Sequence, residues 1–96
     1  MKRTHSKPIG ALLEEFFRSP DIAAKIAEGA LPDTWRQVVG PVVAAETRQV
    51  RLVRGVMYVH VTSSIVRQEL MMQREALVRA INQRAGVAIV QSLVVQ

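Results

Sequence analysis

Apolar side chains at the start of the chain recur at helical spacing. Residues 9–18 carry them three and four positions apart, which predicts an amphipathic helix that ends at Ser19-Pro20. A second, shorter helix is predicted over residues 22–28, with Asp21 as its capping residue. The chain is therefore expected to begin with two short helices.

A third helical stretch is predicted over residues 31–47. Gly40 and Pro41 fall in its middle, and proline lacks the amide hydrogen that continues a helix. We therefore expect two helical segments that meet at Gly40, the second ending near Thr47.

The pattern then changes to a period of two, which is typical of strands. Residues 49–53 and 57–61 alternate, and Arg54-Gly55 between them has the composition of a turn, so we predict a β-hairpin. The residues expected to face the core are Met57, Val59 and Val61, and those expected to face outward are Arg51, Tyr58 and His60.

One long helix and one strand are predicted for the rest of the chain. Ser63 and Ser64 supply capping residues before a helix over residues 65–85, and the Val- and Ile-rich segment 87–95 is predicted as a third strand. The fold class is therefore α+β in the order α-α-β-β-α-β, with helices covering one face of a small sheet. The predicted core is Trp35, Val38, Leu52, Met57, Val59, Val61, Leu70, Leu77, Ile81 and Leu93.

Length and composition indicate one domain. The chain has 96 residues, of which 49% are hydrophobic, and no cysteine, which excludes a disulfide framework. Residues 1–8 are polar and basic, so we expect a flexible tail there and a single domain over residues 9–96. No apolar run approaches the roughly 20 residues that span a bilayer, and the expected location is the cytoplasm.

The charge balance favours an anionic partner. Thirteen Lys and Arg residues stand against eight acids, giving a formal charge of +5, and ten of the thirteen are arginine. Arginine offers a planar fork that suits phosphate and stacks on bases. The alternative is a basic surface that only keeps the protein soluble.

No set of residues has the spacing of a catalytic or metal site. His5 and His60 have no neighbours at metal-ligand spacing, and Glu14 and Glu15, being adjacent, project to different sides of their helix. Phosphate-binding glycine patterns are also missing from the sequence. We therefore expect no enzyme, no catalytic residues, no metal or other cofactor and no small-molecule substrate.

Arginines follow the first predicted strand and its turn. Arg48, Arg51 and Arg54 would spread over about 20 Å in extended geometry, which would allow a row of phosphates to be contacted. Charge that protects an edge strand is the competing explanation. Tyr58 and His60 could add a small stacking platform with Arg51, or could simply be strand residues that face water. The residues assigned to nucleic-acid contact are Lys2, Arg3, Lys7, Arg48, Arg51, Arg54, Tyr58 and His60.

Two further arginines fall within the apolar sector of the predicted long helix. Arg67 and Arg74 lie almost in register, seven residues apart. An arginine there must reach solvent, pair with an acid or contact a partner protein. Pairing within the fold is favoured, and the candidate acids are Glu46, Glu14 and Glu15. Contact with a partner remains the second assignment for Arg67 and Arg74.

A series of short landmarks resembles one bacterial family. The landmarks are Leu31-Pro32-Asp33-Thr34-Trp35, Val38-Val39-Gly40, Glu46-Thr47-Arg48, Gly55 to Val61, Ser63-Ser64, Glu69-Leu70 and Ile81-Asn82. Their order and spacing over residues 31–95 resemble the DciA family. The resemblance implies a fold like a K-homology domain and a role at the start of DNA replication. It also implies interaction with the DnaB-type replicative helicase, help in loading it, DNA binding, and no ATP hydrolysis by the chain itself.

The sequence departs from related patterns at two points. Val66 stands where many members of the family carry a tryptophan, and no Gly-x-x-Gly occurs, which argues against the backbone clamp of K-homology RNA binders. The leading hypothesis is a non-enzymatic replication accessory protein that binds the helicase and single-stranded or forked DNA. The alternatives are a protein-interaction module that does not bind nucleic acid and a KH-like RNA-binding protein.

Overall fold

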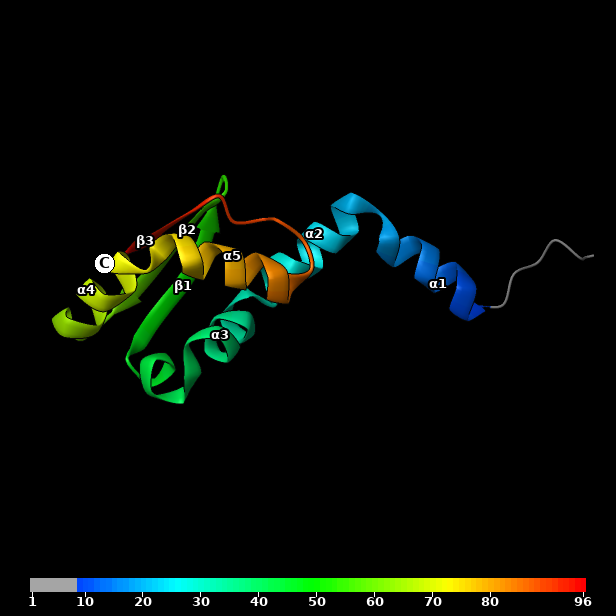
Figure 1. Cartoon of the computed structure of the whole chain (residues 1–96). Helices are drawn as coiled ribbons and strands as arrows, with labels where there is room; N and C mark the ends of the chain where they lie inside the picture. The colour runs from blue at the N-terminus through cyan, green and yellow to red at the C-terminus, as the bar shows by residue number, and fades with distance from the viewer. Residues whose placement is uncertain (1–8) are drawn as a thin grey trace, which may run out of the picture.

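The computed structural model describes residues 9–96, apart from the side chain of Phe17. Figure 1 shows helices at the start of the chain, then a hairpin, two further helices and a final strand. The elements are α1 (Ile9–Arg18), α2 (Pro20–Gly29), α3 (Leu31–Ala45), β1 (Thr47–Val53), β2 (Val56–Val61), α4 (Ser64–Met72), α5 (Arg74–Ala85) and β3 (Ser92–Val95). This order confirms the predicted α+β class. The tail predicted over residues 1–8 lies outside the described residues.

Helices α1 and α2 meet at Ser19-Pro20, as predicted. Pro20 is the first residue of α2, a position where a missing N–H leaves no helical bond unmade. Ser19 therefore occupies the capping position that was expected for Asp21, which lies in the first turn instead. Helix α1 packs mainly against α2 and extends away from the sheet (Figure 1).

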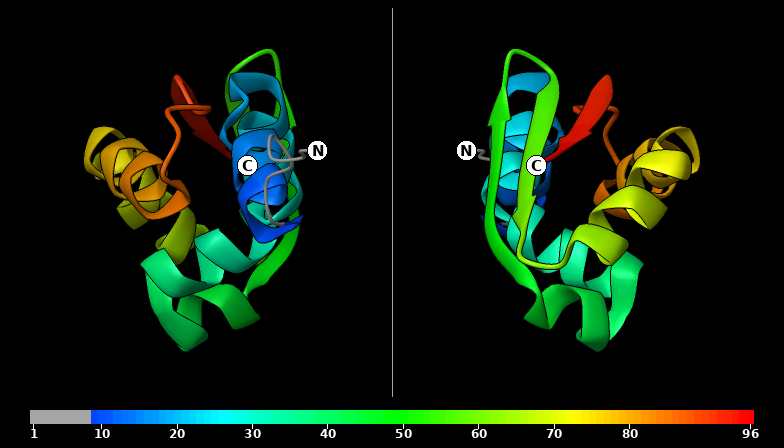
Figure 2. Two further views of the ribbon diagram at one scale, coloured as in Figure 1. Left: turned by 90° about the vertical axis from the view of Figure 1, so that its right-hand side faces the viewer. Right: turned by 90° about the vertical axis from the view of Figure 1, so that its left-hand side faces the viewer.

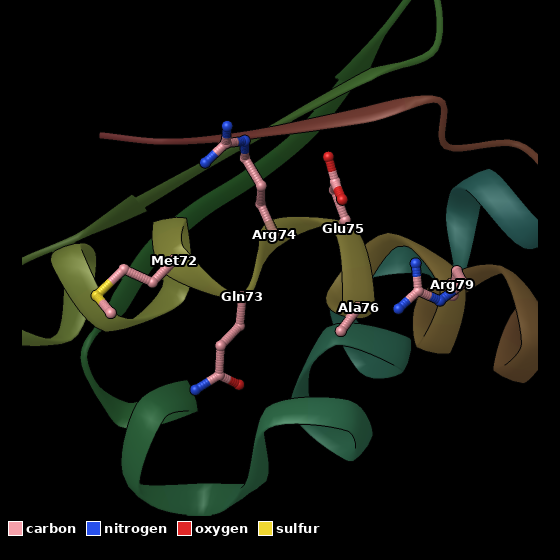
Figure 3. Close-up of a pocket in the computed structure, with 6 residues that line it drawn as sticks. All are labelled: Met72, Gln73, Arg74, Glu75, Ala76 and Arg79. Carbon is pink, nitrogen blue, oxygen red and sulfur yellow. The ribbon is translucent and has the colours of Figure 1, made fainter.

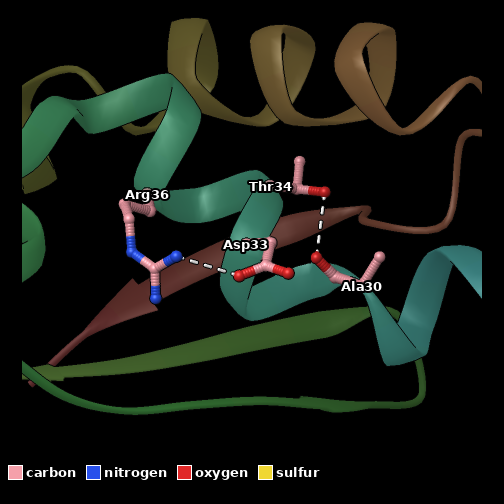
Figure 4. A network of polar contacts seen from close by, with 4 residues as sticks. All are labelled: Ala30, Asp33, Thr34 and Arg36. Atoms are coloured by element: carbon pink, nitrogen blue, oxygen red, sulfur yellow. Dashed lines mark hydrogen bonds and ion pairs between the residues drawn. The ribbon is translucent and has the colours of Figure 1, made fainter.

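The first half of α3 anchors the helices to the core. Trp35 is 1% exposed, and its Nε1–H donates a hydrogen bond to Thr47 Oγ1 at 3.0 Å, which links α3 to the start of β1. The buried hydroxyl of Thr34 donates to the carbonyl oxygen of Ala30 at 3.1 Å (Figure 4). The same figure shows Arg36 paired with Asp33 at 3.0 Å on the exposed side of the helix. One face of this half of the helix therefore packs into the core, and the other is exposed to solvent.

The predicted break in α3 is confirmed at Gly40. Its backbone has φ 86° and ψ 171°, a region that is open essentially to glycine alone. Pro41 then begins the second half, which ends at Ala45 rather than near Thr47. Glycine and proline together therefore turn the helix at this point.

Replacing Gly40 by alanine is expected to lower the free energy of unfolding by about 1–3 kcal/mol, because a Cβ strains this backbone conformation. Urea denaturation followed by circular dichroism measures the change. Gly29→Ala is the matched control, since nothing lies within 4 Å of the added Cβ and its φ is not positive. Equal stability of the Gly40→Ala variant and the unmodified chain would contradict the assigned backbone conformation.

Strands β1 and β2 form the predicted hairpin. Arg54 and Gly55 both have positive φ, 51° and 83°, as a two-residue turn of the hairpin type requires. In the antiparallel register Leu52 lies opposite Met57, and Arg51 lies opposite Tyr58. The pairing places alternate residues on the two faces of the sheet, as the period of two predicts.

Strand β3 completes the sheet next to β2, to which it runs parallel, so the strand order is β1-β2-β3. One face of this sheet contributes Met57, Val59 and Val61, all with no exposed area, to the core. Helices α3, α4 and α5 pack against this face (Figure 2). The opposite face remains exposed or half-buried.

The prediction of a single helix over residues 65–85 is wrong, because the structure contains two helices there, α4 and α5. Ser63 caps α4 by accepting the N–H of Val66 at 3.2 Å, as expected, but the helix ends at Met72 and Gln73 has non-helical angles. A straight helix over this range would be about 31 Å long. Strand β1, with seven residues, spans only about 23 Å. On the two sides of the break, α4 contacts β2 and β3, and α5 contacts both β3 and α3.

The third strand is also shorter than predicted, since residues 87–91 are irregular. The side-chain amide of Asn82 on α5 donates to the carbonyl of Val90 at 2.8 Å and accepts the N–H of Val90 at 2.9 Å. Both backbone groups of Val90 are thereby bonded to a helix instead of a neighbouring strand. Strand β3 therefore begins only after the residue that Asn82 binds.

Seven of the predicted core residues are buried, and the remaining three, Val38, Leu52 and Leu77, are half-buried at its margin. Sequence analysis missed Leu31, Val90 and Val95, which are buried in the same cluster. Leu31 lies at the first position of α3, and Val90 lies in the irregular segment, so neither follows a helical or strand period.

Candidate nucleic-acid interface

The outer face of the sheet carries the residues expected to contact nucleic acid. Arg51, Tyr58 and His60 point away from the core, as predicted, because the strand neighbours of Tyr58 and His60 are buried and those of Arg51 are half-buried. Tyr58 is half-buried and the other two are exposed. We call this set, together with Arg48 and Arg54, the hairpin surface.

Arg51 and Tyr58 form the centre of the hairpin surface. The guanidinium carbon of Arg51 lies 4.4 Å from the centroid of the Tyr58 ring, within the range of a cation–π contact. The contact follows from the register, which places the two residues directly opposite each other. One face of the ring is therefore covered by the guanidinium, and the guanidinium itself is the group on which a base can stack.

Arg48 and Arg54 lie at the two ends of the same strand. Arg48 occupies an irregularity of register between Thr47 and Gln49, and Arg54 occupies the hairpin turn. Both side chains are exposed. Within residues 9–96, Arg36 forms an ion pair with Asp33, whereas Arg48, Arg51 and Arg54 form none with an acid. Their charges are available to an external anion.

Of the remaining residues assigned to nucleic-acid contact, the structure describes only His60. His60 pairs with Gln49 across the hairpin and lies two residues from Tyr58 on the same face. No group of three or more possible metal ligands occurs in residues 9–96. Lys2, Arg3 and Lys7 lie outside the described residues, so their contribution stays a prediction.

The expected pairing of Arg67 and Arg74 with acids is replaced by bonds to main-chain carbonyls. Arg67 is half-buried and donates to Val61 O at 3.2 Å, while its Nε is buried without a hydrogen-bond partner. Arg74 is exposed and donates to Met71 O at 2.8 Å. The carboxylate of Glu46, one of the candidate acids, instead accepts a hydrogen bond from the Thr62 hydroxyl.

Comparison with known families decides the assignment of the chain. A family model described as "Dna[CI] antecedent, DciA" matches residues 8–95. The chain belongs to the DciA family. This membership supports a general role as an accessory protein of DNA replication. No individually curated protein matches the chain.

The DciA domain also exposes an apolar stripe that sequence analysis did not identify as a surface. Ile9, Leu12, Leu13 and Phe16, spaced three and four residues apart on α1, are between 49% and 76% exposed. Helical spacing alone had indicated an amphipathic helix, and periodicity cannot say whether its apolar side is covered. Within the described residues, the side chains of Ile9, Leu12 and Leu13 stay at least 49% exposed, so they are accessible to a partner.

Each helix in the described part of the DciA domain is too short or too polar to cross a bilayer.

Proposed function

We propose that this DciA domain binds a DnaB-type replicative helicase and single-stranded or forked DNA, and thereby assists loading of the helicase. It acts in the cytoplasm without chemistry of its own, and so without a cofactor or a small-molecule substrate. Family membership supports the replication role. The hairpin surface and the stripe on α1 supply two separate surfaces, one polar and one apolar, for two kinds of partner.

The observation that carries DNA binding is the exposed row of Arg48, Arg51 and Arg54 on one edge of an open sheet face. Phosphate contacts supply most of the affinity in such a row and make it sensitive to salt. The Arg51–Tyr58 pair adds a flat group for an unpaired base. Bases are accessible for such stacking in single strands and not inside a duplex, which favours single-stranded or forked DNA.

The surface proposed for the helicase is the stripe on α1. Apolar side chains at i, i+3, i+4 and i+7 are the pattern by which a helix enters an apolar groove of a partner. The chain carries a formal charge of +5, so a second copy would be repelled and an acidic partner attracted. Contact by Arg67 and Arg74 remains a prediction, with Arg74 the more accessible of the two.

The test is co-purification of the chain with the purified DnaB-type helicase of the same organism, with and without a single-stranded oligonucleotide. We expect a complex in both cases, and binding of the oligonucleotide by the chain alone at low salt. A helicase complex without any DNA binding at low salt would favour a pure protein-interaction module. Tighter binding of RNA than of DNA of the same sequence would favour the KH-like RNA-binding alternative.

Replacing Leu12 and Leu13 by glutamate is expected to weaken helicase binding at least about tenfold, because charge on the stripe cannot be buried in an apolar groove. Surface plasmon resonance with immobilised helicase measures the change. Val42→Glu/Ile65→Glu is the matched control, since both residues are exposed apolar side chains on other helices. Equal loss in the two double variants would remove α1 as the docking surface.

A further inference from the structure

Strand β1 has one edge that no other strand covers. It lies at the end of the order β1-β2-β3, and Arg54 and Gly55 join it to β2 in a two-residue turn. In such a hairpin the residues that flank the turn bond to each other, and pairs further along alternate between unbonded and bonded. The register therefore directs the backbone N–H and C=O groups of Val50 and Leu52 away from β2, to the free edge.

These outward backbone groups have no partner in the described part of the chain. Apart from bonds inside helices and between strands, neither Val50 nor Leu52 takes part in a backbone hydrogen bond over residues 9–96. Both side chains are half-buried against the core, which holds this stretch of β1 in the extended form that another strand pairs with. The edge is therefore a template for an added strand.

A hollow of about 290 Å³ lies beside the same edge, lined by residues of α3 and of the first half of β1. Residues of β2 do not line it, which places it on the outer side of β1. Its apolar members are Pro32, Trp35, Ala44 and Val50, and its cations are Arg36 and Arg48. The hollow at the break between α4 and α5, which adjoins another between α5 and β3, is instead lined mainly by charged and polar side chains (Figure 3). The hollow beside β1 is thus suited to one apolar side chain.

The pleat of β1 determines where an added strand would direct its side chains. Residues directly opposite each other share a face of the sheet, so the residue that pairs with Val50 projects its side chain over the hollow. The next residue lies beside Arg51 and projects to the outer face, where this guanidinium has no acidic partner within residues 9–96. Arg48 and Arg54 extend the positive charge beyond both ends. Alternation of apolar and acidic side chains therefore complements the edge.

We propose that the free edge of β1 binds an extended acidic segment of another protein, which adds a fourth strand to the sheet. One apolar side chain of the segment enters the hollow beside Val50, and the acids on either side of it lie near Arg48 and Arg51. A peptide is the occupant because DNA has no peptide groups at strand spacing. A second copy of the chain would bring the same arginines against each other. The proposal goes beyond the function proposed above, since it depends on the backbone of β1 and requires neither DNA nor the stripe on α1.

The test is an NMR titration of the ¹⁵N-labelled chain with the blocked peptide Ser-Glu-Val-Glu-Phe-Glu-Ser, up to about 1 mM. We expect downfield shifts of the Val50 and Leu52 amide protons, slower exchange of these protons with water, and a shift of the Trp35 indole N–H. The control peptide Ser-Glu-Glu-Glu-Val-Phe-Ser has the same composition without the alternation, and should leave the two amides unchanged.

Four results of this titration would overturn the proposal. An absence of shifts at Val50 and Leu52 would show that the edge does not bind the segment, and equal shifts with both peptides would show that only charge is recognised. The same shifts on raising the protein concentration without peptide would assign the edge to a second copy. Slower exchange of these amides with (dT)₁₂, and not with the alternating peptide, would assign it to DNA.

Val50→Pro is expected to weaken binding of the alternating peptide at least about tenfold, because it removes one outward N–H and its ring occupies the space of the added strand. The hairpin tolerates this change, since that N–H makes no bond to β2, and the amide signals of β2 verify that the hairpin is retained. Val50→Ala keeps the N–H and is the matched control, with an expected loss of about threefold from the smaller apolar contact.

Fluorescence anisotropy of the labelled peptide measures both variants. Leu52→Pro against Leu52→Ala repeats the comparison at the second outward residue. Equal losses for the proline and alanine variants at both positions would show that side chains rather than backbone groups bind the peptide, and would overturn the strand pairing.

Discussion

Replacing Arg48, Arg51 and Arg54 together by alanine is expected to weaken binding of single-stranded DNA roughly ten- to a hundredfold at low salt. Each exposed ionic contact contributes about 0.5–1 kcal/mol, so three contacts correspond to about this loss. Their side chains are exposed and carry no ion pair in the described structure, so the lost affinity is not offset by relief of an internal contact.

The salt dependence separates this effect from a general loss of charge. The slope of log affinity against log salt falls by about 0.7 for each phosphate contact with a single strand, so the triple variant should lose about 2 from its slope. Arg18→Ala/Lys25→Ala/Arg84→Ala removes three charges from other helices and is the matched control. Fluorescence anisotropy over a series of salt concentrations measures both. Unchanged affinity of the triple variant would remove the hairpin surface as the DNA site.

Trp35→Ala is expected to lower the free energy of unfolding by about 3–5 kcal/mol, because it removes the largest fully buried side chain and leaves a cavity in the core. The change also removes the hydrogen bond from Trp35 Nε1 to Thr47 Oγ1, which joins α3 to β1. A domain of this size has a stability of about 5–15 kcal/mol, so the variant should be close to unfolding at 37 °C. Urea denaturation followed by circular dichroism measures the change.

Trp35→Phe is the companion to this variant. Phenylalanine keeps most of the buried ring but has no N–H, so its cost should be smaller, about 1–2 kcal/mol, and should come from the lost bond and the remaining void. A loss below 1 kcal/mol for Trp35→Ala would mean that the helices are not anchored through this residue.

The parts of the fold that follow from local pattern were predictable. The hairpin register follows from the period of two on either side of Arg54-Gly55, and the break at Gly40 follows from glycine and proline in sequence. The break at Gln73 has no such signal, because Leu70 and Leu77 are two turns apart and continue a helical stripe across it. The two helices contact different sets of elements, α4 the strands β2 and β3, and α5 both β3 and α3, and this packing is a property of the assembled fold.

The start of β3 illustrates the same limit. A run of Val and Ile predicts a strand from residue 87 onward, but the Asn82 amide binds both backbone groups of Val90. That interaction joins α5 to a segment that follows the helix eight residues later, and it is not visible in the hydrophobic pattern of either segment.

The candidate site also has one part that the sequence predicts and one part that it does not. The outward direction of Arg51 and Tyr58 follows from alternation, so their contact could be expected from sequence. The hollow between α5 and β3 depends on how two elements pack together, so the sequence alone could not predict it. The prediction for Arg67 was wrong: an acidic side chain was expected as its partner, and the structure shows a hydrogen bond to the carbonyl oxygen of Val61.

Strand β1 lies at the margin of the sheet, with one side of its backbone unpaired by another strand. Such a backbone invites strands from other molecules, and the arginines along it keep copies apart by mutual repulsion. In the proposed function, the phosphates of bound DNA would neutralise that repulsion. The two explanations of the arginine row are therefore compatible: the same side chains protect the free protein from self-association and lose this protective role once a polyanion covers them.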